Sequence, residues 1–162
     1  MSKGYSGLFL GTLGALATSG SYNYMQPNDP FSKYIKLRKD IDSNGFYDII
    51  AHGSNDSIFI VNNGKYVAIN HRLLAKILKN DKLSKGKAVR LLSCNTGKVS
   101  SGFAQNLANK LNVPVKAPTD YLWVLPNGHY FVAGGKTING IFVADTTKKG
   151  RFKTFYPGGK KK

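Results

Sequence analysis

Two short apolar runs, each ending at a chemically reactive side chain, constrain the fold of this chain more than any other feature. Residues 46–51 (FYDIIA) lead into His52, and residues 88–92 (AVRLL) lead into Ser93 and Cys94. Short, nearly continuous apolar runs are typical of strands buried on both faces, as in parallel sheets. Parallel strands end at one edge, where open α/β sheets place their sites. The pattern therefore predicts an imidazole and a thiol at the same sheet edge.

The elements expected around these two strands alternate between helix and strand. Asn63-Gly64 has the residue types of a tight hairpin turn, and it is flanked by two β-like segments. We expect, in order, a helix at 31–42, a strand at 46–51, a hairpin at 57–69, a helix at 71–79, a strand at 88–92 and a helix at 100–111. Further strands are expected at 113–116, 121–125, 129–133, 141–144 and 152–156. This order favours an α/β fold with a mostly parallel central sheet, flanking helices and an antiparallel edge extension.

The length of 162 residues and an apolar content of 41% fit one folded domain. We expect a flexible apolar, turn-rich leader or linker at 1–30, a single catalytic domain at 31–159, and a basic tail at 160–162. Within the leader, Gly7–Thr18 is similar to the apolar part of a signal peptide, and it is too short to span a bilayer. A linker or a hydrophobic delivery segment explains it equally well.

The charge of the chain is strongly positive. It has 24 Lys and Arg against 8 acidic residues, all of them Asp, which gives a net charge of +16. Such a charge favours polyanions, anionic membrane surfaces or an acidic protein as partners, and it says nothing about the fold. A single cysteine, Cys94, excludes an internal disulfide framework and a zinc site built on two thiolates.

The two motifs contain the residue types of cysteine catalysis, which needs a thiol, a base and donors for an oxyanion. Cys94 is the candidate nucleophile and His52 the candidate base, and the backbone N–H groups of Gly53 and Cys94 are the candidate oxyanion donors. The alternative is that neither residue is catalytic: Cys94 is packed in the core, and His52 merely caps the end of a strand. Further residues expected to line the cleft are Ser93, Asn95, Thr96, Asp120 and Trp123; for Trp123 a place in the core is the alternative.

Other sites are not indicated. His71 and His129 are expected at the surface, and the sparse carboxylates show no spacing typical of a metal site. Gly134-Gly135-Lys136-Thr137 imitates part of a phosphate-binding loop, but it lacks the upstream glycine and the following helix. We therefore expect neither a metal nor a cofactor.

An apolar block with His-Gly, followed by an apolar block with Ser-Cys, resembles the caspase-type fold of cysteine peptidases. That fold includes caspases, CHAT-type proteases and the autoprocessing domains of large bacterial toxins. The chain from Phe46 to Gly159 is also similar to carboxy-terminal toxin domains of RHS-repeat and other polymorphic bacterial toxins. The segments that carry this second resemblance are Ala51–Ser54, Leu91–Gly97, Ala104–Ala108, Pro114–Asp120 and Phe155–Gly159.

The resemblance implies a secreted or delivered effector that acts in the reducing cytoplasm of a target cell. It implies a peptidase-like hydrolase with Cys94 as nucleophile and His52 as base or acid, a protein substrate, and an acidic immunity protein as partner. Two alternatives remain open. The first is a nuclease or nucleic-acid-binding toxin that uses the basic, aromatic segment Lys148–Tyr156. The second is a non-catalytic relative that only binds a partner.

Overall fold

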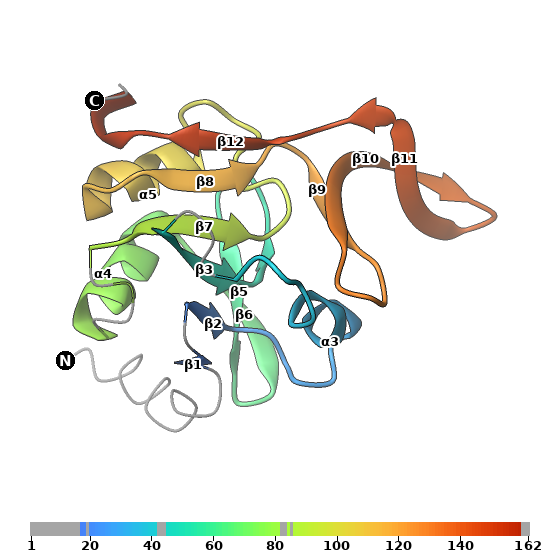
Figure 1. Ribbon diagram of the computed structural model, residues 1–162, viewed down its shortest axis with the longest axis horizontal. Coiled ribbons are helices and arrows are strands. Elements are labelled where there is room, and N and C mark those ends of the chain that lie inside the picture. Colours follow the sequence, from blue (N-terminus) through green and yellow to red (C-terminus); the bar gives the residue numbers. More distant parts are fainter. Residues whose placement is uncertain (1–16, 19, 42–44, 82–83, 85, 160–162) are drawn as a thin grey trace.

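A six-stranded sheet forms the centre of the protein. The computed structural model describes residues 17–18, 20–41, 45–81, 84 and 86–159. Strands β2, β3, β7 and β8 are parallel, and the short β1 and β12 run antiparallel at the two edges. In sheet order the strands are β1 (Ala17–Thr18), β2 (Ser21–Asn23), β3 (Phe46–Ile50), β7 (Ala88–Leu92), β8 (Val115–Pro118) and β12 (Phe152–Phe155). The predicted α/β class with a mostly parallel sheet is confirmed (Figure 1).

Side chains that alternate along the central strands pack into two separate cores. Ile49 and Leu91 point toward α4 (His71–Asp81) and α5 (Phe103–Leu111), whose apolar stripes complete the larger core. Ile50 and Leu92 point the other way, toward α3 (Pro30–Ile35) and β9 (Tyr121–Val124). The sheet is therefore covered on both faces, which explains why its central strands are nearly continuous apolar runs.

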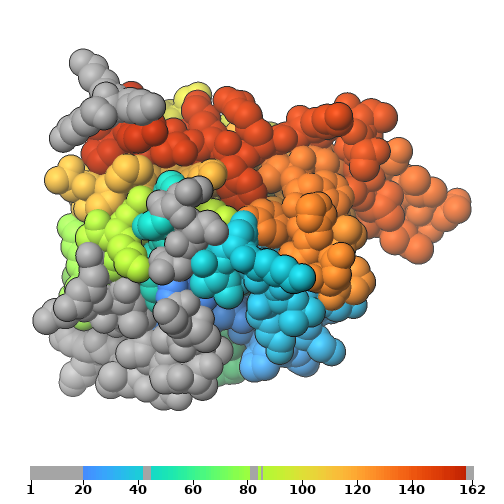
Figure 2. Space-filling model, viewed as in Figure 1, coloured from blue at the N-terminus to red at the C-terminus, as the bar shows by residue number. Residues whose placement is uncertain are grey.

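Two three-stranded antiparallel sheets are attached to this centre. The first follows β3 directly and consists of β4 (His52–Gly53), β5 (Ile58–Asn62) and β6 (Lys65–Ile69). Its turn at Asn63-Gly64 has positive φ angles of 52° and 77°, as the sequence predicted. The second consists of β9, β10 (Tyr130–Ile138) and β11 (Ile141–Lys149). Its β10–β11 hairpin projects from the body of the molecule, and a short 3-10 turn at Pro157–Gly159 follows β12 (Figure 2).

Two expectations about the amino-terminal part need correction. The helix predicted at 31–42 ends at Ile35 and begins at Pro30, capped by Asp29, whose Oδ1 accepts a hydrogen bond from the Phe31 N–H at 3.0 Å. Beyond Ile35 the chain turns so that the Arg38 guanidinium is buried against Asp48. Residues 17–18 and 21–23, assigned to the leader, form β1 and β2 of the main sheet. Residues 1–16, most of the apolar leader, and the basic tail at 160–162 lie outside the described residues.

None of the helices within the described ranges has both the length and the apolarity needed to cross a bilayer.

Candidate active site

The structure brings the His-Gly and Ser-Cys motifs together at the carboxyl ends of β3 and β7. The two strands run in the same direction, with Ile50 paired to Leu92 as the last pair, and the Ala51 N–H donates to the Leu92 carbonyl oxygen at 3.3 Å (Figure 1). Beyond that pair, Gly53 lies directly against the second motif. A Cβ placed on Gly53 would come within 2.9 Å of the Cys94 carbonyl oxygen, so only glycine allows this approach.

The imidazole of His52 is held by a carboxylate from a distant part of the chain. His52 Nε2 lies 2.5 Å from Asp29 Oδ2, and the Tyr66 hydroxyl donates to the same oxygen at 2.8 Å. Burial raises the pKa of Asp29, but the hydrogen bonds from His52 and Tyr66 outweigh it and leave that pKa below its ordinary value. The Tyr66 ring also meets the imidazole edge-on, with 5.2 Å between ring centroids. With Nε2 on Asp29, Nδ1 is the imidazole nitrogen left for a reaction partner.

Cys94 is half-buried, and its thiol bonds to the backbone of β9. The Leu122 N–H donates to Cys94 Sγ at 3.3 Å, and Sγ lies 3.8 Å from the Leu122 carbonyl oxygen. Burial raises the pKa of Cys94, and the nearby negative charge of Asp120 raises it further. No hydrogen bond joins Sγ to the His52 imidazole in the described part of the chain. In this arrangement the raised pKa favours the neutral thiol, and the thiol and the imidazole are each bonded to another part of the chain.

Most of the other predicted cleft residues surround Cys94. Ser93 Oγ and Thr96 Oγ1 are 3.2 Å apart, and Thr96 Oγ1 also donates to the Ser93 carbonyl oxygen. Asn95 has a positive φ of 62°, and its buried Oδ1 accepts no hydrogen bond from the residues that the structure describes. The Asp120 carbonyl accepts from the Asn95 N–H at 2.9 Å. The loop after β7 is therefore fixed by its own side chains and by the segment before β9.

The prediction that Trp123 lines the cleft is wrong. Leu122 contributes its side chain to the same core as Cys94, and Trp123, the next residue on the strand, points to the other side of β9. There the indole Nε1–H donates to the Ala133 carbonyl oxygen at 3.0 Å. The strand was predicted correctly, but the sequence did not show which of its faces would turn toward Cys94.

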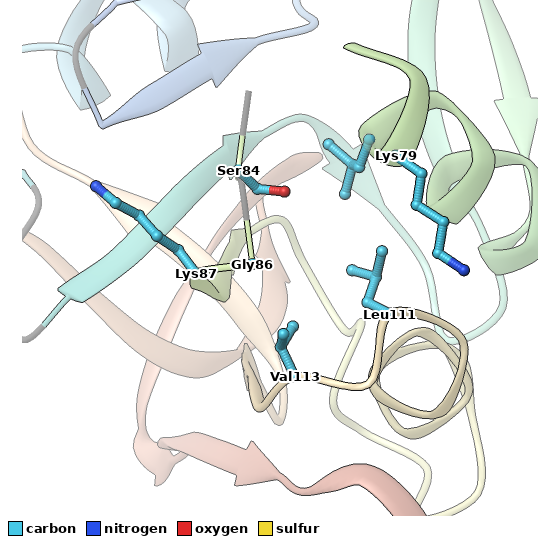
Figure 3. A pocket seen from close by; sticks show the side chains of 7 residues that line it. Lys79, Ser84, Gly86, Lys87, Leu111 and Val113 are labelled. Atoms are coloured by element: carbon cyan, nitrogen blue, oxygen red, sulfur yellow. The ribbon is translucent and has the colours of Figure 1, made fainter. Parts of the chain in front are cut away.

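Two hollows of the surface lie away from these motifs. One, of about 380 Å³, opens where β7 and β8 begin, opposite the edge that carries His52 and Cys94 (Figure 3). It is lined by Leu78, Lys79, Ser84, Gly86, Lys87, Leu111 and Val113. The other, of about 600 Å³, lies between the segment after α3 and the β9–β10 turn, and His129 lies in its wall. Over the described ranges, no three His, Cys or Asp side chains gather as a metal site requires.

The sequence did not point to Asp29 or Tyr66. Asp29 precedes Pro30 and a helical face, a pattern that predicts an N-cap, and this was the one available signal. That pattern predicts a backbone contact only. No spacing rule links Asp29 to an imidazole 23 residues later.

Comparison with known proteins adds one family. A family model described as "Domain of unknown function (DUF8616)" matches residues 20–132, more than half of the chain. This range contains β2, α3, both motifs and Asp29. Searches of curated proteins and of solved structures gave no significant match.

Proposed function

This chain belongs to the DUF8616 family, and we propose that it is a cysteine-dependent hydrolase of proteins, a toxin effector of the caspase-like kind that its motifs resemble. One observation carries the proposal. The His52-Gly53 segment lies against Cys94 at the carboxyl ends of two parallel strands, and Asp29 holds His52 by Nε2. A nucleophile, a base and a third group that orients the base are the requirements of covalent catalysis.

The reaction that fits is acyl transfer to sulfur. Nδ1 of His52 takes the thiol proton while Sγ of Cys94 attacks the carbonyl carbon of a peptide bond. Backbone N–H groups of Gly53 and Cys94 stabilise the oxyanion. The tetrahedral intermediate then collapses, the C–N bond breaks, and the imidazolium gives its proton to the leaving amine. A water molecule, deprotonated by the same imidazole, hydrolyses the thioester and restores the thiol.

The resting contact between Cys94 and Leu122 places a condition on this reaction. Because burial raises the pKa of Cys94, the thiol is not ionised in advance, and the proton moves to His52 only during attack. Sγ first has to leave the Leu122 N–H and turn toward the imidazole. We propose that a substrate strand bound along this edge brings about that turn by displacing the thiol from β9.

The test is to produce the chain in bacterial cells and to map the new protein amino termini that appear. The wild type should create a defined set of cleaved proteins, and C94A and H52A should create none of them. H129A is the matched control, since His129 is exposed and lies outside the motifs, and it should behave as wild type. Cleavage by C94A at the wild-type level would contradict the proposal.

Asp29→Asn tests the role of the carboxylate separately from that of the base. Asparagine caps helices as well as aspartate does, so α3 should be preserved. The negative charge that faces His52 Nε2 is then lost. We expect at least a roughly tenfold slower cleavage, because the imidazole loses its orientation and the partner of its charged form. Unchanged cleavage in a folded D29N would remove Asp29 from the mechanism and would leave the dyad intact.

A non-catalytic binding protein is the second candidate, and one observation favours it. Each reactive side chain is bonded elsewhere, His52 to Asp29 and Cys94 to Leu122. For this candidate, the wild type and C94A would produce identical sets of amino termini. In either case we propose an acidic immunity protein as partner, because a net charge of +16 accelerates association with an oppositely charged protein.

A further inference from the structure

The outer face of the β9–β10–β11 sheet carries a group of aromatic side chains that the proposed hydrolase does not use. Trp123 is paired with Phe131 across β9 and β10, and Thr137 is paired with Phe142 across β10 and β11. Paired residues point to the same side, so these rings share one face with Tyr121. We call Tyr121, Trp123, Phe131 and Phe142 the aromatic face. The residues that alternate with them along these strands, such as Leu122 and Val132, point to the other face and are buried in the core.

Three of these rings contact one another in a fixed arrangement. The Phe142 ring lies 5.5 Å from that of Trp123 at 32°, and 5.1 Å from that of Tyr121 at 71°. The indole is held in place by its hydrogen bond to the Ala133 carbonyl. Phe142 lies over Gly135, where a Cβ would come within 2.1 Å of the ring, so any larger residue there would push the ring aside. Phe142 nevertheless remains 50% exposed.

The charge around the aromatic face is positive. Lys149 on β11 pairs with Ala133 on β10, which in turn pairs with Tyr121 on β9, so the lysine stands on the same face as the tyrosine with β10 between them. From residue 121 to the end of the chain, Asp145 is the single acidic residue. It is 7% exposed and is bonded to Thr147. The basic residues over the same stretch are Lys136, Lys148, Lys149, Arg151, Lys153, Lys160, Lys161 and Lys162.

We propose that the aromatic face binds single-stranded nucleic acid without sequence preference. One exposed ring, Phe142, and three partly buried rings that are already held in place offer a surface for stacking bases, and every base has a π-face. Lysine attracts phosphate without reading base edges. The near absence of acidic residues removes the repulsion that a phosphate backbone would otherwise meet. The aromatic face lies on the side of the β9–β10–β11 sheet opposite the core that contains Leu122 and Cys94, so the proposal stands whether or not the chain is a hydrolase.

The sole tryptophan of the chain makes this binding directly measurable. We expect (dT)10 added to the full-length protein at low salt to quench the fluorescence of Trp123, since a base stacked near the indole deactivates its excited state. The affinity should fall as salt rises, because phosphate contacts release counterions. The absence of any binding at low salt would overturn the proposal.

Substitutions separate stacking from charge alone, with binding followed by anisotropy of labelled (dT)10. F142A and Y121A should each weaken binding by about fivefold or more. Ile141 is the matched control, since it is 65% exposed on the same strand as Phe142 but on the opposite face, so I141A should bind as wild type. Equal binding by F142A and wild type would mean that charge alone acts and would overturn the proposal. Displacement of (dT)10 by polyglutamate at equal charge would overturn it too, in favour of an acidic protein partner.

Discussion

Two pairs of polar residues, one within β3 and β7 and one just beyond their ends, differ in their bonding. Asp48 pairs with Arg90, and four residues further along the chain from each stand His52, in β4, and Cys94, in the loop after β7. At the first pair, Arg90 Nε and Nη2 each donate to an Asp48 oxygen at 2.7 Å, and Arg38 donates to Asp48 as well. At the second pair, imidazole and thiol bond to other parts of the chain. The members of the first pair bond to each other, while those of the second pair bond elsewhere.

The difference shows how position along a strand decides the role of a polar residue. In the middle of the sheet, water is excluded, so a carboxylate is tolerable only when its oxygens are fully bonded. The remaining Arg90 N–H groups reach Asp40 and Tyr130, which completes the network. At the carboxyl edge the strands end, and the His52 side chain is 40% exposed. There the imidazole bonds to Asp29 through Nε2, and the thiol contacts the backbone N–H and carbonyl groups of Leu122.

Asp48→Asn should have the largest effect on stability. It removes the charge that two buried guanidinium groups share. Arg90 then keeps Asp40 as its remaining carboxylate partner, and Arg38 keeps no ion pair among the described residues. We expect a loss of about 3–5 kcal/mol in the free energy of unfolding, measured by urea denaturation. Asp56→Asn is the matched control at an exposed position, with an expected effect below about 0.5 kcal/mol. Equal losses for the two variants would mean that the network does not stabilise the sheet.

Gly53→Ala should cost less stability and more activity. The added methyl would press against the Cys94 carbonyl oxygen and the Ser93 Cβ, both within 3.0 Å. We expect about 1–3 kcal/mol of destabilisation and a displacement of the loop that carries the thiol. Urea denaturation and the cleavage assay would measure the two effects. A fully stable, fully active G53A would show that the close approach of the two motifs is not required.

The bond between His52 and Asp29 should produce a smaller, pH-dependent effect. The folded-state pKa of Asp29 lies below its ordinary value of 3.8, so its stabilising contribution is complete above that value. It is lost as the pH falls through the lowered pKa. Between about pH 5 and pH 2, the melting temperature of the wild type should fall further than that of D29N. If the melting temperatures of the wild type and D29N fell in parallel as the pH is lowered, the bond between His52 and Asp29 would contribute nothing to stability.

Local patterns in the sequence were enough to predict the strands and the meeting of the motifs. The runs before His52 and Cys94 became β3 and β7, and Asn63-Gly64 formed the expected turn. The β10–β11 hairpin shows how far local turn patterns predict the length of strands. Asn139-Gly140 has positive φ angles of 51° and 78°, yet β10 and β11 are longer than the segments predicted around it.

Long-range contacts account for what the sequence did not predict. Arg38 fitted the spacing of a helical face, but its guanidinium binds Asp48 on the central sheet, and the helix ends before it. Asp29 lies in a turn-rich stretch whose composition says nothing about a histidine on another strand. Such partners are chosen by the tertiary fold, which hydrophobic periodicity does not encode.

The rate at which iodoacetamide alkylates Cys94, followed by intact mass across the pH range, tests the partnership of His52 and Cys94 most directly. The chain has one cysteine, so the signal is unambiguous. Because burial raises the pKa of Cys94, little thiolate exists at neutral pH, and reactivity there requires the imidazole. We predict measurable alkylation near neutral pH that H52A abolishes and H129A retains. If the alkylation rates of the wild type and H52A had the same pH profile and rose only in alkali, the partnership of His52 and Cys94 would be contradicted.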